Sequence, residues 1–285
     1  MLRALFASSR PISWVNTAYP FAAAYVLTTG RIDAALVIGT LYFLVPYNLA
    51  MYGINDVFDY ESDLRNPRKG GVEGAVLAKN LHRTTLIGVV VTNVPFLIAL
   101  VALGGPASWL VLAISVFPVI AYSAPKLRFK ERPFLDSLTS STHFVSPAVY
   151  GLALAGASAT GGLVALLVAY FIWGIASHAF GAVQDVVADR AGGIGSVATV
   201  IGARATARFA FVAYLIAGAL LLLTPWPGPL ASLFGVLYAL NVAPFLAISD
   251  ADAERANVGW RRFLLLNYLT GFLVTMLFIW WAYIR

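Results

Sequence analysis

The chain has 285 residues, of which 60% are hydrophobic and only 11% are charged, and its formal net charge is +6. Soluble proteins of this size carry about 25% charged residues, so the composition excludes an ordinary soluble protein. Cysteine is absent, which excludes disulfides and thiolate metal sites. Apolar runs of about 20 residues, the length that crosses a bilayer core, recur along the whole chain. We therefore predict an all-α, polytopic membrane protein that forms one domain over residues 1–285.

Nine membrane spans are predicted, and the charges of their connectors orient the chain. The spans run over 12–29, 34–55, 84–103, 107–123, 137–156, 162–184, 205–224, 230–248 and 262–283. With the N-terminus in the cytoplasm, all but two of the 19 basic residues fall on the cytoplasmic side, the exceptions being Arg31 and Arg285. This asymmetry predicts an N-in, C-out protein of the cell membrane, in contact with membrane lipid. It also explains the positive charge without a nucleic-acid partner.

The acidic residues follow the same side. All but one of the 13 acids lie in the cytoplasmic connectors or at span ends there, and the exception is Asp33. The positive-inside rule gives acids little weight and does not explain this placement. A site that needs carboxylates beside lysines and arginines is therefore expected on the cytoplasmic face.

The second predicted span ends in an acidic motif, Asn55-Asp56-Val57-Phe58-Asp59-Tyr60-Glu61-Ser62-Asp63. On one continuous helix, Asp56, Asp59 and Asp63 are spaced i, i+3, i+7 and share a face. Three converging carboxylates repel one another unless a cation lies between them. Oxygen ligands without His or Cys indicate Mg²⁺, held together with a substrate phosphate. The predicted metal ligands here are Asn55, Asp56, Asp59 and Asp63.

Basic residues follow this motif and the fourth predicted span, which ends in Tyr122-Ser123-Ala124-Pro125-Lys126-Leu127-Arg128-Phe129-Lys130. Such cations can clamp the oxygens of a diphosphate and stabilise it as a leaving group. For any single Lys or Arg, membrane topology is an equally good explanation. The predicted diphosphate ligands are Arg10, Asn16, Asn55, Arg68, Lys69, Lys126, Arg128 and Lys130. The ring of Tyr122 can stabilise a carbocation or contact the diphosphate.

A second acidic motif, Gln184-Asp185-Val186-Val187-Ala188-Asp189, lies where the sixth predicted span ends on the same side. Asp185 and Asp189 are spaced i, i+4 and are predicted as further metal ligands. Taken alone they can be ordinary interfacial acids. Beside the first motif they indicate a duplicated bundle in which each motif holds a metal against one diphosphate. The predicted catalytic residues are Asp56, Asp59, Tyr122, Asp185 and Asp189.

Together these motifs resemble the UbiA family of intramembrane prenyltransferases. That family carries NDxxDxxxD after its second helix, YxxxK after the fourth and DxxxD after the sixth, which correspond here to Asn55–Asp63, Tyr122–Lys126 and Asp185–Asp189. The resemblance covers nearly the whole chain. It implies nine helices around a central cavity, Mg²⁺ dependence and transfer of a prenyl group to a lipophilic acceptor.

Within that family, the chain is most similar to actinobacterial lycopene elongases of C50 carotenoid pathways. Segments 9–20, 51–56, 66–75 and 122–133 carry this similarity. It implies that dimethylallyl diphosphate is the donor and lycopene the acceptor, giving C45 and C50 products. An aromatic quinone precursor is the alternative acceptor. A membrane transporter is the alternative from another class, although its acids are expected near the bilayer midplane.

Other polar residues have simpler explanations. Asn48, His143 and His178 lie inside predicted spans, and we expect packed, neutral histidines and a hydrogen-bonded asparagine. The acidic run Asp250–Glu254 lies in a connector and is expected to be a solvated surface.

Overall fold

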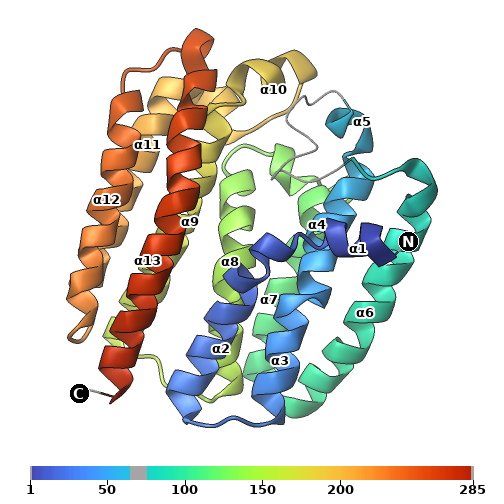
Figure 1. The fold of residues 1–285 in the computed structure, drawn as a ribbon, viewed down its shortest axis with the longest axis vertical. Coiled ribbons are helices and arrows are strands. Elements are labelled where there is room, and N and C mark those ends of the chain that lie inside the picture. The colour runs from blue at the N-terminus through green and yellow to red at the C-terminus, as the bar shows by residue number, and fades with distance from the viewer. Residues whose placement is uncertain (1, 65–75, 284–285) are drawn as a thin grey trace. The chain divides into compact units, whose positions relative to one another are not determined.

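The computed structural model describes residues 2–64 and 76–283. In these ranges all regular secondary structure is helical, and turns and loops connect the helices (Figure 1). The α-helices are α1 (Leu2–Ser8), α2 (Val15–Thr29), α3 (Ala34–Leu44), α4 (Pro46–Phe58), α5 (Tyr60–Asp63), α6 (His82–Leu103), α7 (Pro106–Ser123), α8 (Leu135–Leu154), α9 (Gly161–Val183), α10 (Val186–Gly192), α11 (Val197–Leu221), α12 (Ser232–Val242) and α13 (Asn257–Tyr283). The fold class predicted from composition is confirmed.

Seven helical stretches of the described chain are long and apolar enough to cross a membrane. All nine predicted spans overlap helices, but the first and fifth fall outside that set. Helix α2 has only 15 residues. The first half of α8 is rich in hydroxyl side chains between Ser137 and Thr142, which lowers its hydropathy. The chain is therefore an integral, multi-pass membrane protein.

Contacts gather in two compact units. The first comprises residues 1–129 and 142–157, and the second comprises 130–141 and 158–285. The prediction of one domain over residues 1–285 remains a prediction.

Aromatic side chains form the centre of the first unit. Phe21, Tyr42, Phe43, Tyr47 and Tyr150 are all fully buried and pack ring against ring. Each tyrosine hydroxyl that is buried in an apolar core needs a partner. Tyr47 donates to backbone carbonyls of α7 and α8, and Tyr150 donates to a carbonyl of α6. These bonds join helices distant in sequence.

The second predicted span, 34–55, is confirmed within the candidate span Ala34–Phe58, but it is built from two helices. Helix α3 ends at Leu44 and α4 begins at Pro46, whose ring cannot donate an N–H and disrupts a helix. Asn48 satisfies the polar groups at the break. Its buried Nδ2 donates to Thr17 Oγ1 at 2.7 Å and to the carbonyl oxygens of Phe43 and Leu44 at 2.8 and 3.1 Å. The expectation of a hydrogen-bonded asparagine is confirmed.

Asp33, the one acid expected on the opposite side from the others, has a structural role. Its Oδ1 accepts the N–H of Leu36 at 3.1 Å and so caps α3, while Oδ2 accepts the hydroxyl of Tyr25 at 3.0 Å. The backbone N–H of Leu36 lowers the pKa of Asp33 below its usual value, because a hydrogen bond favours the charged form.

In the second unit, α9, α11, α12 and α13 run alongside one another (Figure 1). Helix α11 begins at Val197, eight residues before the predicted start at 205, because Ser196 and Thr199 form a capping box there. The backbone leaves helical geometry at Gly202, with φ 82° and ψ 162°. This left-handed φ suits glycine. Helix α11 is therefore two helical segments joined at a kink.

Glycines bring α11 and α12 into backbone contact. A Cβ at Gly235 would lie 2.6 Å from the carbonyl oxygen of Tyr214 and 2.7 Å from Cα of Gly218. Small residues of this kind let transmembrane helices approach closely.

We expect Gly235→Ala to lower the free energy of unfolding by about 1–3 kcal/mol, because the added methyl group meets backbone that cannot move aside. Unfolding in detergent micelles measures this loss. Gly271→Ala in α13 is the matched control, since nothing lies within 4 Å of a Cβ added there. Equal stability of the two variants would contradict the close approach.

Candidate functional site

The first acidic motif lies at a helix break. Helix α4 ends at Phe58, and Asp59 caps it with φ −103° and ψ 4° before the short helix α5 begins. Asn55 and Asp56 belong to α4, whereas Asp63 belongs to α5. The premise of one continuous helix with a shared acidic face is therefore wrong. Asp56 and Asp59 are nevertheless both buried, with 2% and 4% of their surface exposed.

Arg10 pairs with Asp56. Its Nη2 lies 3.3 Å from Asp56 Oδ1, and its guanidinium carbon lies 4.3 Å from the centroid of the Tyr52 ring. The backbone of Arg10 is left-handed, with φ 48° and ψ 74°. Its Nε is buried and has no hydrogen-bond partner in the described structure. A cationic donor is therefore held beside a buried carboxylate with hydrogen-bonding capacity left over.

Arg128 pairs with Asp59 in the same way, at 3.4 Å between Nη2 and Oδ1. Asn55 Nδ2 donates to Asp59 Oδ2 at 2.5 Å and to Ser123 Oγ at 2.9 Å, and so ties α4 to the end of α7. Asp56 and Asp59 thus each pair with an arginine, whereas the exposed Glu61 of the same motif pairs with Lys79 at 2.7 Å. Such buried charges are tolerated because they are paired and hydrogen-bonded.

The other predicted residues of the first unit are less enclosed. Tyr122, at the end of α7, is half-buried, and its ring meets that of His143 edge to face at 5.3 Å. Lys126 is exposed on the turn after α7, with φ 71°. Asn16 is exposed in the first turn of α2. Lys130, at the start of the second unit, is half-buried in a 3₁₀ turn. Arg68, Lys69 and the side chain of Asp63 lie outside the described residues.

The second acidic motif also lies at a helix break, within the second unit. Helix α9 ends at Val183, and α10 begins at Val186. Asp185 occupies the N-cap position, and its carbonyl accepts the N–H of Asp189 at 2.8 Å. Both aspartates are half-buried, while Val186 between them is fully buried in the core. Helix α10 is therefore anchored by an apolar side chain on one face.

Polar anchors to which the sequence analysis assigned no role lie in and near this motif. Gln184 Oε1 accepts the Nδ2 of Asn257, at the start of α13, at 2.5 Å. Asp136, fully buried in the first turn of α8, accepts the N–H of Val197 at 2.9 Å. Its signal in the sequence was a lone carboxylate beside a run of hydroxyl residues. Ser137, the next residue, lies 3.1 Å from Nδ1 of His178.

The donor set is all oxygen. Within residues 2–64 and 76–283, no group of three His, Cys, Asp or Glu side chains is assembled that could hold a metal by itself. Carboxylate and amide oxygens are nevertheless the ligands that suit Mg²⁺, which usually takes one or two carboxylates and completes its shell with water and substrate phosphate. The residues present fit an ion that binds together with a diphosphate.

We expect Asp136→Ala to lower the free energy of unfolding by about 1–3 kcal/mol, because the buried N–H of Val197 loses its acceptor. Asp136→Asn keeps an oxygen for that N–H and should lose less. Unfolding of both variants in detergent micelles tests the order, and equal stability of Asp136→Ala and the unsubstituted protein would contradict it.

Comparison with known proteins shows the family to which the chain belongs. The model of the UbiA prenyltransferase family matches residues 17–269. A protein of Dietzia sp. named "C(50) beta-cyclic carotenoids biosynthesis protein LbtBC" is 60% identical over 98% of this chain, which spans 65% of that protein's length. A lycopene elongase/hydratase of Corynebacterium glutamicum is 53% identical over 98% of this chain and 97% of its own length.

A solved structure gives the fold independently. A UbiA homolog from Archaeoglobus fulgidus, bound to DMAPP and Mg²⁺, superposes with a TM-score of 0.70 over 94% of this chain and 98% of that one, at 17% sequence identity. The match of the family model extends over most of the chain, and the two relatives exceed half identity. The chain is therefore a member of the UbiA family and a prenyltransferase.

Proposed function

We propose that this protein transfers the dimethylallyl group of dimethylallyl diphosphate to lycopene, in a Mg²⁺-dependent reaction that gives C45 and C50 carotenoids. The observation that carries the donor half is the pair of buried carboxylates, Asp56 and Asp59, each beside its own arginine. The acceptor half is supported by the names of the relatives at 53–60% identity.

Asn55, Asp56 and Asp59 would hold one Mg²⁺, and Asp185 and Asp189 another, with Asp63 as a further proposed ligand. When bound, Mg²⁺ supplies a Lewis acid that draws electron density from the diphosphate oxygens. The carboxylates of the first motif provide negative charge that is already buried, so the attraction of a bound ion would offset the cost of their desolvation.

The arginines have a second task in this proposal. Arg10 and Arg128 are held at the acidic motif by ion pairs, and the buried Nε of Arg10 has a hydrogen bond still to give. Both guanidinium groups would donate hydrogen bonds to the diphosphate and stabilise its negative charge as it leaves. Asn16, Arg68, Lys69, Lys126 and Lys130 are proposed to complete the phosphate-binding set.

The reaction itself is a substitution at an allylic carbon. The C–O bond breaks, and its electron pair leaves with the diphosphate. The allylic carbon then bonds to a terminal alkene of lycopene, which leaves a tertiary cation on the acceptor. Loss of a proton, directly or after water has added, completes the round, and a second round at the other end takes C45 to C50. The ring of Tyr122, fixed against His143, is proposed to stabilise the allylic cation.

The proposed orientation places the N-terminus and the diphosphate site on the cytoplasmic side of the cell membrane. Its support is the segregation of nearly all basic residues to the connectors of one side. A soluble diphosphate would then reach the site from the cytoplasm, while lycopene would arrive from the bilayer.

The acceptor is tested by product analysis. Membranes that contain the protein, supplied with Mg²⁺, dimethylallyl diphosphate and lycopene, should form C45 and C50 pigments, and removal of Mg²⁺ by EDTA should stop their formation. Mass spectrometry of the pigments also shows whether the products carry added water. Formation of a prenylated aromatic quinone precursor, without C45 or C50 pigment, would overturn the lycopene assignment.

The two motifs are tested by substitution. Asp56→Ala and Asp185→Ala should each lower turnover by at least about 100-fold, because each removes a proposed metal ligand. The matched control is Glu254→Ala, since Glu254 is an exposed acid in the 3₁₀ turn Asp250–Ala256. Size-exclusion chromatography in detergent checks that the variants are folded. Turnover retained by both motif variants would refute the metal assignment.

A further inference from the structure

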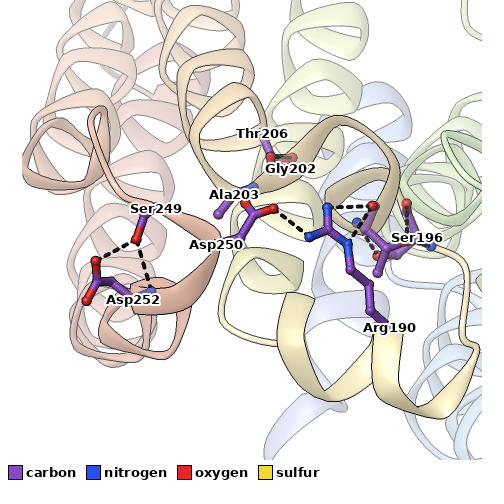
Figure 2. A network of polar contacts seen from close by, with 9 residues as sticks. Arg190, Ser196, Gly202, Ala203, Thr206, Ser249, Asp250 and Asp252 are labelled. Carbon is purple, nitrogen blue, oxygen red and sulfur yellow. Dashed lines mark hydrogen bonds and ion pairs between the residues drawn. The ribbon is translucent and has the colours of Figure 1, made fainter.

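A polar network joins the helix of the second acidic motif to the turn that precedes the last helix. Arg190, which directly follows Asp189 on α10, lies 2.5 Å from Asp250 between Nη1 and Oδ2 (Figure 2). Its Nε and Nη2 both donate to the carbonyl oxygen of Thr199, at 3.0 and 2.8 Å. The guanidinium is therefore held on two sides by the protein itself.

The other oxygen of Asp250 serves the kink in α11. Oδ1 accepts the N–H of Ala203 at 2.7 Å, directly after Gly202, where the helical backbone is interrupted. An interrupted helix leaves N–H groups without intrahelical acceptors, and a side-chain oxygen at that point acts as a cap. Asp250 thus caps the second segment of α11 while it pairs with Arg190. We call Arg190, Thr199, Ala203 and Asp250 the α10 clamp.

This arrangement corrects the expectation that the acidic run 250–254 is solvated surface. Asp252 fits that expectation, because it is exposed and, among the residues that the structure describes, hydrogen-bonds only to Ser249 in the same turn. Asp250, two residues earlier, instead connects three separate elements of the second unit. The two aspartates lie in the same short turn, but Asp250 contacts α10 and α11 whereas Asp252 contacts only its own turn. Composition does not reveal this difference.

Helix α10 needs such support. It has seven residues, so its own hydrogen bonds are too few to hold it as an isolated helix. The buried side chain of Val186 anchors its start. Arg190, one turn later, fixes the other end, where Asp189 lies. The position of Arg190 therefore contributes to the orientation of the helix that carries Asp189.

We propose that Asp250 is a positioning residue for prenyl transfer, because through Arg190 it holds α10 in the orientation that its two aspartates need to bind a metal–diphosphate substrate. This inference rests on the proposed role of Asp185 and Asp189. In this inference Arg190 supports the site, because its guanidinium pairs with Asp250 and donates to the carbonyl oxygen of Thr199.

Hydrogen exchange tests the clamp without reference to activity. Amides of residues 186–203 should exchange faster in Asp250→Ala than in the unsubstituted protein, while those of α6 in the first unit stay unchanged. Asp252→Ala is the matched control, being the same substitution two residues away in the same turn, and should leave both segments unchanged. Unaltered exchange over 186–203 in Asp250→Ala would overturn the proposal.

Metal dependence tests the consequence for the site. In Asp250→Ala, the Mg²⁺ concentration for half-maximal turnover should rise about tenfold, as for other outer supports of metal ligands. Binding of Mn²⁺ in the presence of dimethylallyl diphosphate, followed by electron paramagnetic resonance, should weaken by a similar factor. Asp250→Asn keeps an acceptor for the N–H of Ala203. Its Mg²⁺ requirement should therefore lie between those of Asp250→Ala and the unsubstituted protein. An unchanged metal requirement in both variants would overturn the positioning role.

A double-substitution cycle separates positioning from general loss of stability. Arg190→Ala and Asp250→Ala act on one contact, so the double variant should need little more Mg²⁺ than either single variant. Fully additive effects would contradict a shared clamp. If Asp185→Ala keeps its turnover, the proposed metal site fails, whereas faster exchange of α10 in Asp250→Ala would still establish the clamp.

Discussion

The structure depends on how a membrane protein keeps carboxylates buried. An unpaired carboxylate taken out of water is costly, and fewer charges are available here than in a soluble chain. Asp56 and Asp59 are each paired with an arginine, and Asp136 accepts a backbone N–H. These partners come from segments far away in the sequence. Helices of one unit are thereby fixed to one another at the places where the acidic side chains lie.

Helix breaks place these acids. The first motif spans the end of α4, and the second spans the junction of α9 and α10. In a continuous helix the backbone donors and acceptors bond to one another, and the side chains are distributed around one straight axis. A break ends one helix and begins another at the motif, and helix ends leave backbone groups without intrahelical partners. In both units a short helix then follows, α5 in the first and α10 in the second. The duplication expected from the sequence remains a prediction.

Support for a short helix must come from outside it. The α10 clamp supplies this support with groups from α11 and from the turn before α13, while Gln184 and Asp136 hold the segments on either side. Metal sites typically depend on such outer contacts, because ligands must be held in place before the ion arrives. The second motif thus has a structural frame that involves residues spread over more than a hundred positions of the chain.

The sequence by itself determined the membrane class, the helical fold and the family. Apolar runs of bilayer length and three spaced motifs are local properties of the sequence, so they can be recognised without knowing how the helices pack. It also located Asp56, Asp59, Asp185 and Asp189. Only the tertiary structure decided which cation accompanies which acid, that α3 and α4 are separate helices, and that Asp250 is a cap while Asp252 is not. These depend on contacts between residues distant along the chain, and on breaks where a buried side chain such as Asn48 replaces a lost backbone bond. Periodicity and composition carry no record of such pairings, because both are read from neighbours in sequence.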